Sequence, residues 1–168
     1  MPPAKTVSVR RARPNDVPAL VSVFRSVARE RVYLYTEKVS GDQVGRMKKR
    51  LKDRKSLIAV AEVDGKVVGS LVLERGPAAK SAHLRTLGIS VMKGFRGIGA
   101  GSALMEYAID WARANHVKKI TLGVFSSNPA AVRLYKKFGF ELEGRLKNQF
   151  LIKDEFVDEL LMGLQLSP

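Results

Sequence analysis

The sequence predicts a single mixed α/β domain over residues 1–168, in the order β-α-α-β-β-β-α-β-α-β-β, with both parallel and antiparallel strand pairs. Three observations support this prediction. The chain has 168 residues, which is typical of one domain. Its content of 45% hydrophobic and 27% charged residues is that of a globular protein. Strand-like and helix-like periodicities also alternate along it.

The first third predicts one strand and two helices. Residues Thr6–Arg13 alternate apolar and polar side chains, as a half-buried strand does. Asn15 or Asp16 can then cap a helix. Apolar residues recur at helical spacing from Val17 to Ala28, and a second helix follows from Ser40 to about Asp53.

The middle of the chain predicts three strands and a glycine-rich turn. Two β-rich runs, Leu57–Val63 and Lys66–Glu74, flank the turn dipeptide Asp64-Gly65 and so predict a hairpin. Residues Ser81–Val91 resemble another strand, and the segment Gly94–Gly101 that follows it is rich in glycine.

The last third predicts two helices and three strands. A helix over Ser102–Asn115 precedes the alternating strand Lys118–Phe125. Asn128-Pro129 begins a helix that ends near Phe138, before Gly139. Residues Phe140–Ile152 and Glu155–Leu164 then form a closing hairpin.

The composition excludes several classes of site. The chain has no cysteine, so it has no disulfides, thiol nucleophile or cysteine-bound metal. Its two histidines make a histidine-rich metal centre unexpected, and we expect no metal. No apolar stretch has the length of a membrane helix, so we expect a cytoplasmic domain without membrane contact.

The net charge of +14 predicts anionic partners. Nucleic acid, phosphorylated cofactors and acidic proteins all fit this charge. Residues 1–56 hold 15 basic and 5 acidic side chains and so account for +10 of this net charge, and seven of the cationic side chains lie between Arg46 and Lys55. That helix is either a solvated face with Met47 and Leu51 turned inward, or an electrostatic guide for a phosphorylated cofactor, an acidic substrate or ribosomal RNA.

The glycine-rich turn is the most informative segment. Glycines between a strand and a helix let backbone N–H groups and the helix N-terminus hold a phosphate. The segment matches neither a Walker A loop nor the G-x-G-x-x-G fingerprint, because Gly97, Gly99 and Gly101 are spaced differently. A tight turn that needs small residues is the alternative.

Two motifs in register resemble the GNAT superfamily of N-acetyltransferases. Arg96-x-x-Gly99-x-Gly101 is similar to its acetyl-CoA motif. The segment Asn128–Phe140 is similar to its second signature, N-x-x-A-x-x-L-Y-x-K-x-G-F. The predicted element order also matches the GNAT fold, so the resemblance covers nearly the whole chain and implies an acetyl-CoA-dependent N-acetyltransferase.

The resemblance implies a splayed central sheet and assigns the acetyl-CoA site. The strand before the turn would pair with the pantetheine arm, and the turn would hold the pyrophosphate. Arg96 would brace the turn or contact phosphate, or is simply a solvated arginine. Asn128 would bond the pantetheine arm, cap its helix, or do both. The cofactor residues are Ile89, Ser90, Val91, Arg96, Gly97, Ile98, Gly99, Ala100, Gly101, Ser102, Asn128 and Tyr135.

The resemblance also implies the reaction, in which a neutral amine attacks the thioester carbonyl directly. Tyr135 would donate a proton to the leaving thiolate, since a phenol is protonated at neutral pH; a packed core aromatic is the alternative. The base is less well defined, because Gly123 stands where N-terminal alanine acetyltransferases have a glutamate. We consider His83, Glu74 and Glu30 as catalytic candidates.

The acceptor pocket is predicted in the segment between the first two helices. Tyr33, Tyr35 and Glu37 would receive the amine there, unless they form only a surface loop. The C-terminal stretch from Glu143 to Met162 resembles that of GNATs acting on free L-amino acids and ribosomal-protein N-termini. An α-amine acceptor is therefore favoured over an internal lysine.

Two other functions stay open at this level. One is a basic module that binds nucleic acid or the ribosome, and the other is a CoA-binding regulatory domain without catalysis. The apolar run Leu160–Leu164 is compatible with a homodimer interface and equally with a core strand.

Overall fold

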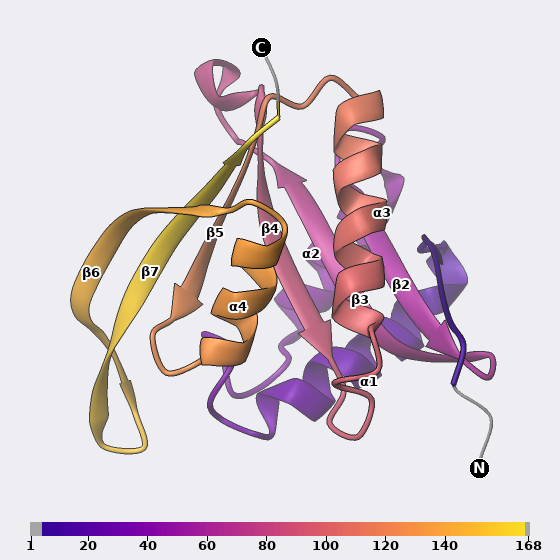
Figure 1. Ribbon diagram of the computed structural model, residues 1–168. Coiled ribbons are helices and arrows are strands. Elements are labelled where there is room, and N and C mark those ends of the chain that lie inside the picture. Colours follow the sequence, from indigo (N-terminus) through magenta and orange to yellow (C-terminus); the bar gives the residue numbers. More distant parts are fainter. Residues whose placement is uncertain (1–4, 167–168) are drawn as a thin grey trace.

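A seven-stranded mixed sheet with helices on both faces forms the fold (Figure 1). The computed structural model describes residues 5–166. Its strands are β1 (Val7–Arg11), β2 (Leu57–Val63), β3 (Lys66–Arg75), β4 (Leu84–Val91), β5 (Lys119–Phe125), β6 (Glu141–Ile152) and β7 (Glu155–Gln165). Its α-helices are α1 (Val17–Ala28), α2 (Gly41–Lys52), α3 (Ala100–Ala114) and α4 (Pro129–Lys137). The predicted order of strands and helices is confirmed.

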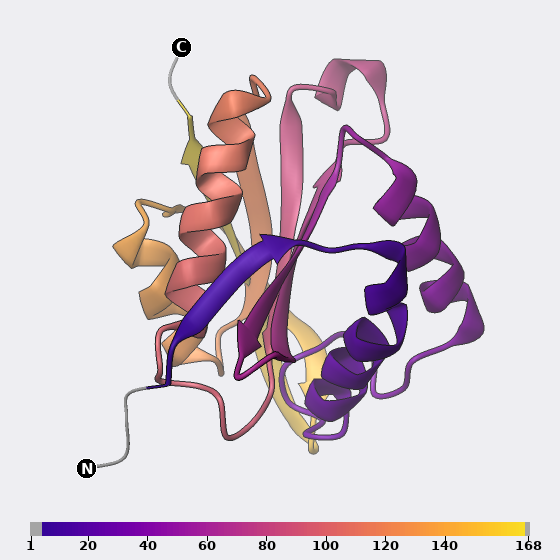
Figure 2. The ribbon, with the colours of Figure 1, turned by 90° about the vertical axis from the view of Figure 1, so that its right-hand side faces the viewer.

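The strands lie in the order β1-β2-β3-β4-β5-β7-β6. All neighbours are antiparallel except β4 and β5, which run parallel. α3 and α4 cover one face, and α1 and α2 cover the other (Figure 2). Among the described residues, no helix is long and apolar enough to cross a membrane.

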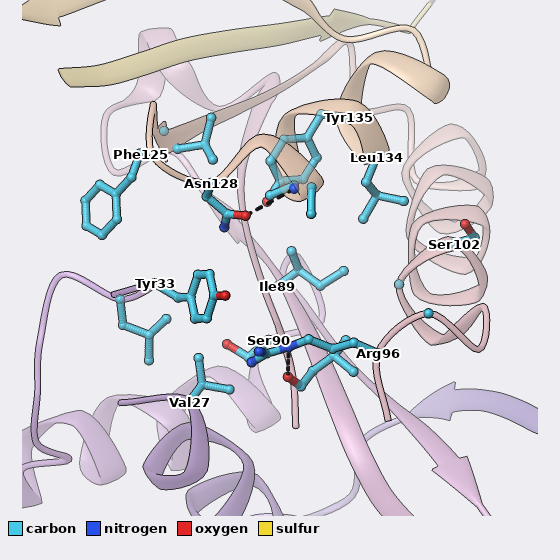
Figure 3. Close-up of a pocket in the computed structure, with 18 of the residues that line it drawn as sticks. Val27, Tyr33, Ile89, Ser90, Arg96, Ser102, Phe125, Asn128, Leu134 and Tyr135 are labelled. Atoms are coloured by element: carbon cyan, nitrogen blue, oxygen red, sulfur yellow. Dashed lines mark hydrogen bonds between the residues drawn. The ribbon is translucent and has the colours of Figure 1, made fainter. Parts of the chain in front are cut away.

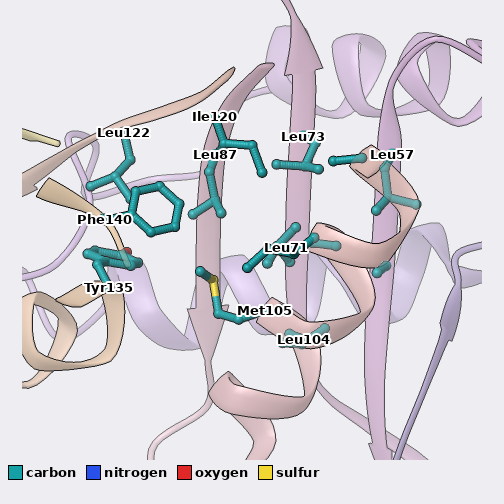
Figure 4. Close-up of a cluster of buried hydrophobic side chains, with 14 of the residues drawn as sticks. Leu57, Leu71, Leu73, Leu87, Leu104, Met105, Ile120, Leu122, Tyr135 and Phe140 are labelled. Atoms are coloured by element: carbon teal, nitrogen blue, oxygen red, sulfur yellow. The ribbon is translucent and has the colours of Figure 1, made fainter. Parts of the chain in front are cut away.

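The main core lies between the sheet and the pair α3 and α4 (Figure 4). Leu71 and Leu73 of β3 meet Leu104 and Met105 of α3 there, and all four are fully buried. A second cluster under α1 and α2 includes Leu20, the helix residue Met47, and Val60 of β2. The inward position of Met47 agrees with the predicted inner face of the basic helix.

Most predicted boundaries lie within two residues of those in the structure, and the largest error is at the start of β4. The strand expected to begin at Ser81 begins at Leu84, because Ala79–Ser81 form a short 3₁₀ turn. The Ser81 hydroxyl donates to the carbonyl of Ala78 and accepts from the Ala78 N–H, which satisfies the turn locally. Serine often makes such bonds in turns instead of joining a strand ladder.

The feature that positions the site is the separation of β4 from β5. The two strands pair over only three positions, from Leu84↔Lys119 to Thr86↔Thr121. Beyond Thr86, β4 stays paired with β3 on its other side, and β5 stays paired with β7. The end of β4 from Leu87 to Val91 therefore has one open edge, and the predicted splay of the central sheet is confirmed.

Candidate functional site

A cavity of about 430 Å³ occupies the wedge between β4 and β5. Volumes of this size are usual for small-molecule sites. Two of its walls are the predicted cofactor residues Ile89–Val91 and the end of β5, Gly123–Phe125. The remaining wall comes from the glycine turn, α4 and the segment after α1 (Figure 3). The wedge thus brings most of the predicted site residues together.

The open edge of β4 has a specific chemical consequence. Because β4 stays paired with β3, only every second residue past Thr86 turns its backbone N–H and C=O groups to the cavity side, and these have no neighbouring strand. Backbone polar groups need partners when a ligand removes water from them. An extended ligand with amide groups can provide these partners as an added strand does.

The glycine turn forms the floor of the site where α3 begins. Gly97 and Gly99 have φ values of 73° and 90°, a conformation that side-chain-bearing residues rarely adopt. Gly99 is the N-cap of the fifteen-residue helix α3, whose first N–H groups have no intrahelical acceptor. A Cβ on either glycine would meet no atom within 4 Å, so the space above the backbone is open. This geometry suits a phosphate group.

Arg96 anchors the turn to the rest of the site. Its Nε donates to the Val91 carbonyl at 2.9 Å (Figure 3), and its two terminal nitrogens donate to Glu30 at 2.9 and 2.6 Å. Its guanidinium also lies 4.8 Å from the centre of the Tyr33 ring. The bonds to Glu30 raise the pKa of Arg96, so the arginine stays charged. These contacts tie the turn to the end of β4 and to Glu30, which follows α1.

Asn128 and Tyr135 reach the cavity from the two ends of α4. The Asn128 side-chain oxygen accepts from the Ala131 N–H at 3.2 Å, so the residue caps the helix, and it also lines the cavity (Figure 3). Tyr135 lines the cavity too, although only 6% of it is exposed, and its ring packs 5.8 Å from that of Phe140. Burial raises the pKa of Tyr135 to about 12.

Aromatic side chains form the wall opposite α4. Tyr33 and Tyr35 both line the cavity, as predicted for the acceptor segment. The Tyr35 ring stacks on Phe150 at 5.0 Å and meets the edge of Phe125 at 5.5 Å. Its hydroxyl donates to the carboxylate of Glu159 on β7. Although Tyr35 is 63% exposed as a whole, desolvation of its hydroxyl, and then this bond, raise the pKa of Tyr35.

Several predicted residues lie outside the cavity lining. Ile98 packs against the main core, and Ala100 is buried at the start of α3. The Glu37 carboxylate accepts from Arg31 at 2.8 Å on the surface, which lowers the pKa of Glu37. Glu30 is engaged by Arg96.

The other two candidate bases lie away from the wedge. The Glu74 carboxylate accepts two bonds from Arg50 of α2, at 2.8 and 2.7 Å. His83 is exposed and precedes β4, whereas the cavity lies at the other end of that strand. Neither side chain lines the cavity.

Sequence reasoning missed part of the lining. Val27, Leu34 and Phe125 contribute apolar surface to the cavity, and Gly123 lines it with its backbone. The partner of Tyr35, Glu159, was also missed. Only the alternation of β7 could have indicated that Glu159 faces away from the main core, and alternation alone does not identify its neighbour.

Comparisons with known proteins are consistent with this geometry. Residues 21–140 match the model of the Acetyltransferase (GNAT) family. The chain is 34% identical over 162 residues to the L-amino acid N-acetyltransferase AaaT of Escherichia coli K12. The aligned region covers 94% of this chain and 96% of that protein. It is 29% identical over 150 residues to an N-alpha-acetyltransferase of Sulfurisphaera tokodaii, covering 82% and 81% of the two chains.

The fold also resembles solved structures. A putative acetyltransferase from Salmonella typhimurium, determined with its cofactor acetyl-CoA, superposes with a TM-score of 0.87. The match covers 96% of this chain and 94% of that one at 21% identity, so it is a likeness of fold.

Proposed function

The chain belongs to the Acetyltransferase (GNAT) family and is an acetyl-CoA-dependent N-acetyltransferase, and we propose that it acetylates the α-amine of an amino acid or of a protein N-terminus. The observation that carries this proposal is the open wedge between β4 and β5, next to a glycine turn at a helix N-terminus. The names of the two relatives, which refer to L-amino acids and to N-alpha-acetylation, support an α-amine.

The residues present fit acetyl-CoA. When bound, acetyl-CoA supplies an acetyl group activated as a thioester. The open edge of β4 would bond the amide groups of its pantetheine arm, with Asn128 contributing its side-chain amide. The N–H groups between Gly97 and Ser102 would hold the pyrophosphate, while Arg96 keeps the turn in place.

Tyr135 would act at the leaving sulfur. With a pKa of about 12, its hydroxyl keeps its proton throughout the neutral range. A protonated donor beside a developing thiolate lowers the barrier to its departure. The sulfur would need to lie within hydrogen-bond reach of the Tyr135 oxygen.

The acceptor would enter along Tyr33, Tyr35 and Phe125. An amine attacks only in its neutral form, and an α-amine with a pKa of about 7.7–8.0 is closer to that form than a lysine near 10.4. Holding the amine in this walled pocket also supplies proximity, which is a large part of catalysis in two-substrate reactions. The base candidates His83, Glu74 and Glu30 stay predictions.

We also propose two further partners, a second copy of this chain and nucleic acid. Exposed Leu142, Leu146, Leu151 and Phe156 on β6 and β7 would suit a homodimer interface. The alternative of nucleic-acid or ribosome binding rests on the net charge of +14. A cytoplasmic location and a single domain over residues 1–168 also stay predictions.

The test is a screen of free amino acids, N-terminal peptides and polyamines with acetyl-CoA, in which released CoA thiol is measured. We expect turnover with α-amines. Stabilisation by acetyl-CoA without thiol release from any amine would favour a regulatory CoA-binding domain. Absence of both would contradict the cofactor assignment, and acetylation of polyamines alone would contradict the acceptor class.

A further inference from the structure

Glu159 of β7 places a buried carboxylate directly beside the acceptor end of the wedge. The residue is 9% exposed, and it lies diagonally across from Gly123 in the β5–β7 pair. A Cβ added to Gly123 would overlap Glu159 Oε1 and come within 2.6 Å of the Tyr35 oxygen. The absence of a side chain at 123 therefore leaves room for a carboxylate delivered from the neighbouring strand.

This carboxylate has no cation beside it. None of the salt bridges found within residues 5–166 includes Glu159, and its side-chain partner there is the neutral hydroxyl of Tyr35. The adjacent Asp158, by contrast, accepts from Arg145 and from the Asn148 N–H. A buried carboxylate without a cation is costly unless something else neutralises it.

The surroundings of the Glu159–Tyr35 pair favour an ammonium group. Phe125 and Phe150 meet edge to face at 5.0 Å, and both contact the Tyr35 ring. Aromatic faces attract cations, and the carboxylate adds a full negative charge behind the Tyr35 hydroxyl. Tyr35 and Phe125 line the cavity, so an amine could reach this end of it.

We propose that Tyr35 and Glu159 form a proton relay that deprotonates the acceptor amine. The N–H bond of the ammonium breaks, and its proton passes to the Tyr35 oxygen. The phenolic proton of Tyr35 passes at the same time to Glu159 Oε1. The electron pair stays on the nitrogen, which becomes the nucleophile. Glu159 later returns its proton to solvent.

The protonated state of the Tyr35 hydroxyl determines the order of these proton transfers. Because its pKa is raised, the Tyr35 hydroxyl keeps its proton at neutral pH and cannot take up a second one, so its own proton must leave as the new one arrives. Tyr35 is thus the group that touches the amine, and Glu159 is a positioning residue that acts through it. This inference rests on the proposed N-acetyltransferase function.

The other charged groups near the relay are already engaged. Asp158 is bound by Arg145, and Glu37 is bound by Arg31. Lys119 of β5 pairs with Glu143 of β6 at 2.8 Å. The β5 residues next to Glu159 are Gly123, which has no side chain, and Phe125, and its register partner on β6 is Leu146. Tyr135 of α4 contributes a further raising effect on the pKa of Tyr35. Among these groups, the Tyr35–Glu159 pair is therefore the one free to exchange protons with the amine.

The chain offers a matched control for Glu159. Glu143 lies over Gly163 as Glu159 lies over Gly123. A Cβ on Gly163 would lie 2.5 Å from the Glu143 carboxyl carbon. Glu143, however, is neutralised by Lys119 and does not line the cavity. Glu143→Gln thus makes the same chemical change beside a glycine of the neighbouring strand, on an exposed residue outside the relay.

The test compares Glu159→Gln, Tyr35→Phe and Glu143→Gln with the wild type between pH 6 and 9.5. We expect kcat for an α-amine at pH 6.5 to fall about 100-fold in the first two variants. The deficit should shrink above the pKa of the amine, because a neutral amine needs no proton acceptor. Glu143→Gln should match the wild type, and the rise in Tm produced by acetyl-CoA should be equal in all four proteins.

Two results would overturn the relay. One is a Glu159→Gln deficit that is equal at every pH, which would indicate a structural role. The other is full activity of Glu159→Gln at pH 6.5. A wild type that acetylates no amine would instead contradict the proposed function, so the two failures are distinguishable.

Discussion

Tyr135 combines a core position with a place in the cavity wall. Its ring packs beside Phe140, and its hydroxyl would donate the proton to the leaving sulfur. We expect Tyr135→Phe to keep the packing and to lower kcat by about 100-fold, the usual value of a positioned proton donor. The Kd for acetyl-CoA, measured by calorimetry, should change little. Unchanged turnover would remove Tyr135 from the mechanism.

The raised pKa of Tyr135 also predicts how stability depends on pH. A folded-state pKa of about 12, against an unfolded value of about 10, means that the proton is held more tightly in the folded protein. The contribution of Tyr135 is therefore fully present below pH 10 and is lost as the pH rises towards 12. Between pH 9 and 11 the wild type should lose about 1 kcal/mol more of its free energy of unfolding than Tyr135→Phe.

Urea unfolding of both proteins at pH 9 and pH 11 measures this difference directly. The remaining tyrosines are common to the two proteins, so their titration cancels. Parallel losses of stability in the two proteins would mean that the Tyr135 hydroxyl titrates alike in the folded and unfolded chains.

Individual site residues were predictable where a local motif contains them. Asn128 and Tyr135 lie in one motif that resembles the GNAT superfamily and Gly97 and Gly99 lie in another, so the resemblance predicted one site for all four, and all four line the cavity. Glu159 belongs to neither motif. Its proximity to Gly123 depends on the register of β5 with β7 and on how Tyr35 folds back, which no short pattern encodes.

At the scale of the element, α4 depends on Asn128 for its start, and the same residue faces the cavity. The two roles use different atoms, because the cap uses the side-chain oxygen whereas a bound ligand would use the amide nitrogen. Asn128→Ala should cost about 1 kcal/mol of stability through the lost cap. Asn128→Ser should restore most of that stability, since serine is also a good cap.

Binding separates the two roles further. We expect both Asn128 variants to bind acetyl-CoA more weakly than the wild type, although only the alanine variant is less stable. Chemical denaturation and calorimetry on the same samples test this. Wild-type affinity in Asn128→Ser would assign Asn128 to the cap alone.

The elements themselves were largely predictable because local signals agree with the final packing. Asp64-Gly65 lies between β2 and β3, and Gly139 follows the end of α4 with a φ of 89°. The start of β4 was misplaced because residues Ser81–His83 can satisfy a strand pattern, while the Ser81 hydroxyl stabilises a turn. The separation of β4 from β5 needed the family resemblance, since it is a property of strand pairing and not of either strand.

At the scale of the whole molecule, the charge and the phosphate site lie in different parts of the chain. Most of the +14 net charge lies in residues 1–56, whereas the glycine turn begins at Gly94. The turn can hold a pyrophosphate with backbone groups and a helix end, without a lysine cluster. The excess charge is therefore available for long-range attraction of polyanions such as CoA.

The exposed face of α2 is the natural place to test such attraction. Lys48 and Lys49 are exposed there, while Met47 between the helix and the sheet is buried. Lys80 and Lys118 are also exposed and lie near His83, at the end of β4 opposite the cavity. Reversing either pair of lysines changes the net charge equally, so the two double variants differ only in where the charge is removed.

We expect Lys48→Glu/Lys49→Glu to lower the association rate constant of CoA about tenfold at low salt, with a smaller effect from Lys80→Glu/Lys118→Glu. The difference should disappear near 0.5 M salt, because the Debye length is then only a few ångströms. Stopped-flow binding at 20, 150 and 500 mM salt measures it. Equal effects of the two pairs would show that net charge matters and that α2 has no special role. A salt-independent loss would indicate that α2 contributes through its structure and not through its field.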